Sequence, residues 1–139
     1  MKNNFETFDL EPYLLEAISE LDFKEPTDIQ TEVISNIQSK RDVVAQSKTG
    51  SGKTHAFLLP LINQLSKEAN NVQVLITAPS RELAEQLYQA AIQLTQNAPW
   101  DINIARFIGC TNKAKQIEIL ENSQPAVAIG TPGRLLDLI

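Results

Sequence analysis

The chain has 139 residues and a formal net charge of −5, a length that supports one packed domain but not two. The acidic balance argues against a nucleic-acid binder that acts through bulk positive potential, so any such contact must be local. The single cysteine, Cys110, excludes an internal disulfide and favours a reducing compartment. No signal-peptide pattern is found and no stretch approaches the ~20 apolar residues of a membrane span, so we expect no membrane partner.

Helical and extended patterns alternate along the chain. The first half predicts helices at residues 12–21, from a Thr27 cap to Ile37 and from Lys53 onward, and a short apolar strand at residues 42–46. The second half predicts strands at residues 72–78, 102–108 and 126–130, and helices after Ser80, at residues 113–121 and after Pro132. The strand at 72–78 is apolar enough to be buried on both faces.

Strands separated by helices predict an α/β fold, in which helices flank a parallel sheet. Ligands of such sheets bind beyond the carboxyl ends of the strands. The turns at residues 47–54, 79–84 and 130–134 each follow a predicted strand. We therefore expect all three turns at the same edge of the sheet.

The glycine-rich turn is the most specific pattern in the chain. It consists of Ser47, Lys48, Thr49, Gly50, Ser51, Gly52, Lys53 and Thr54. A turn of this kind between a strand and a helix predicts a phosphate loop, whose backbone N–H groups and helix N-terminus bind a nucleotide. Lys53 would reach the β- and γ-phosphates and the Thr54 hydroxyl would bind Mg²⁺, which makes them the candidate catalytic residues. Ser47 replaces the usual first glycine, and a glycine-rich connection that binds nothing is the alternative.

A second pattern, FKEPTDIQ, spans residues 23–30. A glutamine amide both donates and accepts, so Gln30 can pair with N6 and N7 of adenine and reject guanine. Here the chain resembles the DEAD-box helicase family, whose adenine-reading Q motif is F-x-x-P-T-x-I-Q. The resemblance implies that Phe23 and Gln30 lie at the adenine and that Phe5 packs near the base. Asp22 stands where the family usually has glycine.

Further segments match the family in order. APSRELA at residues 78–84 resembles motif Ia, TPGR at 131–134 matches motif Ib, and Gly109 matches half of a Gly-Gly pair that Cys110 interrupts. In the family these turns bind RNA phosphates, which suits helix N-termini and arginines. The resemblance implies RNA contacts at Pro79, Ser80, Arg81, Gly109, Thr131, Pro132, Gly133 and Arg134. A capped helix and a Pro-Gly turn are the structural alternatives.

No D-E-A-D and no S-A-T sequence is present, although in the family both follow motif Ib and a second RecA-like domain comes later. The resemblance implies one partial RecA-like P-loop domain over residues 1–139, incomplete at the C-terminus. Residues 1–40 would form its Q-motif helical region and residues 41–139 its α/β core. The family's missing strands would lie beside the motif Ia strand, so we expect exposed apolar strand edges.

The resemblance implies an ATP- and Mg²⁺-dependent RNA helicase that binds RNA through its backbone. We expect a location in the bacterial cytoplasm, because the chain has no long extension of the eukaryotic kind. Without the DEAD carboxylates and the second domain, we expect no useful ATPase activity from these residues alone. Two alternatives stay open. Another P-loop ATPase would give no role to Gln30 or to residues 131–134, and a non-catalytic fragment would bind RNA or a partner protein without turnover.

Overall fold

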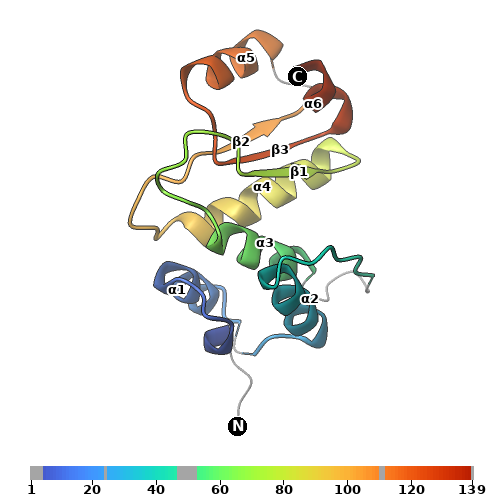
Figure 1. The fold of residues 1–139 in the computed structure, drawn as a ribbon. Coiled ribbons are helices and arrows are strands. Elements are labelled where there is room, and N and C mark those ends of the chain that lie inside the picture. The colour runs from blue at the N-terminus through green and yellow to red at the C-terminus, as the bar shows by residue number, and fades with distance from the viewer. Residues whose placement is uncertain (1–4, 24, 47–52, 110–111, 139) are drawn as a thin grey trace. The chain divides into compact units, whose positions relative to one another are not determined.

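The computed structural model describes residues 5–23, 25–46, 53–109 and 112–138. Its elements, in chain order, are a 3-10 helix η1 (Phe5–Phe8), α1 (Pro12–Glu20), α2 (Asp28–Gln38), α3 (Lys53–Asn63), β1 (Val74–Thr77), α4 (Arg81–Thr95), β2 (Ile104–Phe107), α5 (Lys113–Asn122), β3 (Val127–Gly130) and α6 (Pro132–Leu138) (Figure 1). They divide into a helical unit (Met1–Gln64 and Gln93–Pro99) and a sheet unit (Leu65–Ile92 and Trp100–Ile139). Within the described ranges, no helix is long and apolar enough to cross a membrane.

The helical unit contains the predicted helices at their predicted places. α1 begins with Pro12 in its first turn, where a missing N–H costs nothing, and it buries Leu14 and Ile18 on one face. α2 begins with a capping box. The Thr27 hydroxyl accepts the Gln30 N–H at 3.3 Å, and the Gln30 side-chain oxygen accepts the Thr27 N–H at 2.8 Å. The predicted Thr27 cap is therefore confirmed, and Gln30 takes part in it.

Both α1 and α2 end on a residue in the left-handed region. Asp22 follows α1 with a φ of 59°, and the Phe23 N–H donates to the Ile18 carbonyl at 3.1 Å. Lys40 follows α2 with a φ of 59° as well. This is the helix ending that most often uses glycine, and Asp22 adopts it here without being glycine.

The described strands form a parallel three-stranded sheet in the order β1-β3-β2. In its register, Thr77, Gly130 and Phe107 lie side by side at the carboxyl edge. α4 covers one face of the sheet, and α5 and α6 cover the other (Figure 1). The parallel sheet flanked by helices that the sequence predicts is confirmed.

The core of the sheet unit lies between β2, β3 and the helices of one face. Ala105, Phe107 and Ala128 form a buried cluster, against which Leu120 of α5 and Leu135 of α6 pack. All four residues of the central strand β3 are buried. The turns that leave this sheet therefore start from a rigid, closely packed strand end.

The strand predicted at residues 42–46 is wrong. These residues have no regular secondary structure and are exposed, with Val44 fully exposed. An extended segment becomes a strand through hydrogen bonds to a neighbouring strand. None of the strands in the described part of the chain pairs with residues 42–46, so its apolar character alone does not make it a strand.

The prediction that the strand at 72–78 is buried on both faces is also wrong. β1 is shorter and lies at one edge of the described sheet, where Ile76 is buried but Leu75 is 59% exposed. An edge strand is covered less completely than a central one. The exposed Leu75 agrees with the expectation of an uncovered apolar strand edge.

Candidate functional site

The nucleotide half of the candidate site is described in part. Lys53 and Thr54 form the first turn of α3 and are both half-buried. The predicted phosphate-loop residues Ser47, Lys48, Thr49, Gly50, Ser51 and Gly52 lie outside the described residues. The helix start that the phosphate loop requires is thus confirmed, whereas the loop itself and its common edge with the other turns stay predictions.

Two of the predicted adenine-side aromatics line one cavity of the helical unit. Phe5 is buried and, with Phe23, borders a cavity of about 360 Å³. The Phe23 ring also meets the His55 ring edge-on, with centroids 4.9 Å apart. This contact ties the Q-motif aromatic to α3, two residues after Lys53.

His55 is held neutral by its surroundings. Burial lowers the pKa of its imidazole from the ordinary value of 6.5, since the charged form is the one that loses hydration. Its Nε2 is buried without a hydrogen-bond partner. Its ring contact with Phe23 is a packing contact, and the described residues contain no group of three side chains that could hold a metal ion.

Gln30 is 3% exposed and does not lie on the surface. Its side-chain oxygen accepts the Thr27 N–H, as described above. The surface-residue alternative for Gln30 is thereby excluded. Its amide is held in a fixed orientation at the start of α2, which is what a base-reading side chain requires.

The RNA half of the candidate site is assembled at the carboxyl edge of the sheet. The Ala78 N–H donates to the Gly130 carbonyl at 3.0 Å, and the Thr131 N–H donates to the Phe107 carbonyl at 3.2 Å. These two bonds join the turns that follow β1, β3 and β2. The prediction that residues 79–84 and 130–134 share an edge is confirmed, and the turn at Gly109 joins them.

Most residues assigned to this half are accessible. Pro79, Ser80, Arg81, Gly109, Pro132 and Gly133 are exposed, and Thr131 and Arg134 are half-exposed. The Ser80 hydroxyl accepts the Leu83 N–H at 3.2 Å, which caps the first turn of α4. The structural alternative of a capped helix is therefore true of Ser80 and leaves the exposed Arg81 side chain beside it.

The sequence analysis missed Gln116 of α5. Its side chain is 1% exposed and links two of the motif turns. Its Nε2 donates to the Ile108 carbonyl at 3.2 Å, and its Oε1 accepts Arg134 Nη1 at 2.9 Å. Its burial could have been inferred from its position four residues before Leu120. Residues four apart share one face of a helix, and Leu120 packs against the sheet.

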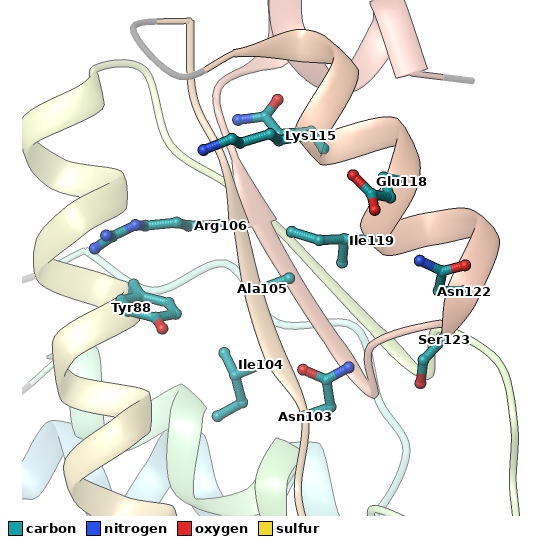
Figure 2. A pocket seen from close by; sticks show the side chains of 11 residues that line it. Tyr88, Asn103, Ile104, Ala105, Arg106, Lys115, Glu118, Ile119, Asn122 and Ser123 are labelled. Atoms are coloured by element: carbon teal, nitrogen blue, oxygen red, sulfur yellow. The ribbon is translucent and has the colours of Figure 1, made fainter.

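A groove of about 680 Å³ runs along the open edge of β2, between α4 and α5. Figure 2 shows Arg106 reaching from β2 toward Tyr88 of α4, whose ring it covers at 4.6 Å, while Ile119 and Asn122 face the groove from α5. Arg106 also pairs with Glu85 of α4. The lining contains none of the residues that the motifs assigned, but it includes Gln116, which bonds to Arg134.

Comparisons with known proteins agree with the motifs. Residues 27–139 match the family model described as DEAD/DEAH box helicase. The DEAD-box ATP-dependent RNA helicase CshB of Bacillus subtilis is 48% identical over 139 residues, which is 99% of this chain and 32% of the relative. The chain thus spans about a third of the length of that relative.

Solved structures show the same fold. A DEAD box protein from Methanococcus jannaschii superposes with a TM-score of 0.87 at 36% identity, covering 96% of this chain and 36% of that one. S. cerevisiae Dbp5 bound to RNA and ADP BeF3 superposes with a TM-score of 0.84 at 33% identity, covering 98% of this chain and 34% of that one. The α/β fold is therefore the RecA-like fold of these helicases, and the chain belongs to the DEAD/DEAH box helicase family.

Proposed function

We propose that this chain is the nucleotide- and RNA-binding N-terminal segment of an ATP-dependent RNA helicase. The observation that carries the proposal is the meeting of three motif turns at one edge of the sheet. The turns at Ala78, Phe107 and Gly130 are joined there by backbone hydrogen bonds. In an open α/β sheet this edge is where ligands bind.

The chemistry of that edge suits a sugar–phosphate backbone. α4 and α6 both begin there, and the N–H groups of a first helical turn favour anions. Arg81 and Arg134 place positive charge beside them. A net charge of −5 leaves little long-range attraction, so RNA contact depends on these local groups. Contacts to the sugar–phosphate backbone do not distinguish one base from another, so we expect RNA binding to depend only weakly on base sequence.

The nucleotide would lie at the start of α3. Lys53 would reach the phosphates, and Gln30 would supply the donor and acceptor that distinguish adenine from guanine. Thr54 fits Mg²⁺ as a single hydroxyl ligand, and phosphate oxygens of the nucleotide would have to supply others. When bound, the ion would neutralise phosphate charge. We propose that this chain binds ATP and ADP but does not turn ATP over, and that the parent protein acts in the cytoplasm.

The adenine assignment can be tested with Gln30→Glu. A glutamate at this position still accepts the Thr27 N–H, so the capping box remains, but the carboxylate cannot donate to adenine N7. We expect ADP to raise the melting temperature of the wild-type chain more than GDP does. In Gln30→Glu this preference should disappear while the melting temperature without nucleotide changes little.

The matched control is Gln124→Glu, which makes the same change at an exposed residue two positions after the end of α5. It should keep the preference for ADP. A wild-type chain indifferent to both nucleotides, or a Gln30→Glu variant that still prefers ADP, would contradict the adenine assignment.

A further inference from the structure

We propose that Gln116 is a positioning residue, which holds the Arg134 side chain and the Ile108–Gly109 turn in the orientation that binds RNA. The inference rests on the proposed function, because it explains how the RNA half of the site is kept in shape. Gln116 lies in α5, outside every motif assigned above. Its role is to act through Arg134 and the turn, and it does not itself contact RNA.

The hydrogen bonds around Gln116 form a closed circuit. One amide group donates to the Ile108 carbonyl at 3.2 Å and accepts from Arg134 at 2.9 Å. Arg134 in turn donates from Nη2 to the Gly109 carbonyl at 3.3 Å. The turn after β2, α5 and the start of α6 are thus connected through a side chain that is 1% exposed.

Because Gln116 is buried, the geometry of these hydrogen bonds is tightly restricted. A buried amide that lacks partners is costly, so Gln116 holds its partners in one arrangement. The guanidinium is planar, and two acceptors on separate segments fix the direction of that plane. Arg134 is therefore held in one orientation before RNA arrives, which removes part of the ordering cost of binding.

The second end of Gln116 orients the turn. A trans peptide is planar, so the carbonyl of Ile108 and the N–H of Gly109 point in opposite directions. Because the carbonyl is held toward Gln116, the N–H of Gly109 points away from α5. Gly109 is exposed, and an outward backbone N–H is a suitable donor to a phosphate oxygen.

The test distinguishes the effects of the two hydrogen bonds made by the Gln116 amide. Gln116→Leu removes both hydrogen bonds with little change in volume. Gln116→Glu keeps an acceptor for Arg134 but cannot donate to Ile108. Gln124→Leu, at an exposed glutamine of the same unit, is the matched control. Each 139-residue variant is studied by NMR, which follows the Arg134 Nη–H signals, the donors of the two hydrogen bonds, and is then titrated with a short single-stranded oligouridylate.

We expect a sharp, exchange-protected Arg134 signal in the wild-type chain, and loss of that protection in Gln116→Leu. Oligouridylate affinity should fall roughly three- to tenfold in Gln116→Leu, since one to two hydrogen bonds that position the site are lost. Gln116→Glu should regain the Arg134 signal and most of the affinity, to within about threefold of wild type. Gln124→Leu should match the wild type, and all variants should bind ADP alike.

Several results would overturn the inference. The first is an Arg134 signal that is not protected from exchange in the wild-type chain. The second is a Gln116→Leu variant that binds RNA as tightly as the wild type does. The third is a Gln116→Glu variant that binds RNA as weakly as Gln116→Leu does. A purely structural role predicts that affinity follows melting temperature instead of the Arg134 signal. Failure of the wild-type chain to bind oligouridylate would overturn the proposed RNA function itself, a result distinct from altered binding in the variants.

Discussion

Single residues explain how this chain departs from its family without losing the family's local structure. Asp22 has a φ of 59° in the turn that ends α1. A left-handed conformation costs most residues about 1–2 kcal/mol, although Asp tolerates it better than most. Because the backbone hydrogen bonds, and not the side chain, define this turn, Asp can stand where the family usually has glycine.

This turn gives a prediction about stability. Asp22→Gly should raise the free energy of unfolding by about 0.5–1 kcal/mol, because glycine adopts a positive φ without steric cost. Urea denaturation measures the change. Ser39→Gly is the control, since Ser39 has an ordinary φ of −81° and glycine there should lower stability. Equal effects of the two substitutions would contradict the argument from backbone strain.

His55 gives a prediction about pH. Burial lowers the pKa of its imidazole below 6.5, so the unfolded chain binds the proton at a higher pH than the folded chain does. Stability is therefore lost as the pH falls through 6.5. Urea denaturation at about pH 7.5 and about pH 5.5 should show this loss, and His55→Phe, which keeps a ring beside Phe23, should reduce it. A loss of the same size in His55→Phe would assign the effect to other groups.

At the scale of elements, packing at the carboxyl ends of the strands determines the arrangement of the candidate RNA site. Gly130 ends β3, and a Cβ there would lie 2.4 Å from the Phe107 carbonyl oxygen and 3.0 Å from the Leu135 side chain. The Phe107 oxygen belongs to the backbone of β2, which cannot move without disturbing the sheet. Glycine is needed at this position because β2, β3 and α6 approach one another closely.

Gly130→Ala should therefore lower the free energy of unfolding by about 1–3 kcal/mol, as expected for overpacking. Thermal and urea denaturation would both detect a change of this size. Gly133→Ala is the matched control, because a Cβ at Gly133 meets nothing within 4 Å and its cost should be small. A Gly130→Ala variant as stable as Gly133→Ala would show that the contact relaxes freely.

At the scale of the whole molecule, an exposed apolar side chain at the edge of the described sheet favours association with other chains. Leu75 on the edge strand β1 is 59% exposed. An uncovered edge with an apolar side chain favours pairing with another chain. The fraction of apolar residues is ordinary for a globular protein, but Leu75 is not covered by other described residues as a core leucine would be.

We expect the chain to associate as its concentration rises, and Leu75→Thr to reduce that association while introducing a β-branched residue, which suits a strand. Sedimentation velocity over a range of concentrations measures the effect. Leu136→Thr removes a comparably exposed leucine, 75% exposed, from α6. If both variants associate equally, the edge of β1 is not the surface responsible.

The sequence by itself determined the helices, the parallel α/β class and the motif residues. Helix starts at Pro12, Thr27 and Ser80 follow from local hydrogen bonds and φ preferences that a short segment contains. The family motifs in turn named the exposed residues at the strand ends. The phosphate loop and the adenine contact of Gln30 stay predictions, to be tested by nucleotide binding.

Only the tertiary structure decided which extended segments became strands and which polar residues were buried. Residues 42–46 have the composition of a strand, but hydrogen bonds to a neighbour make a strand, and that neighbour is not specified locally. Gln116 resembles any polar residue of a surface helix until packing brings Ile108 and Arg134 to its two ends. Both outcomes depend on contacts between segments far apart in the chain, which local sequence patterns do not encode.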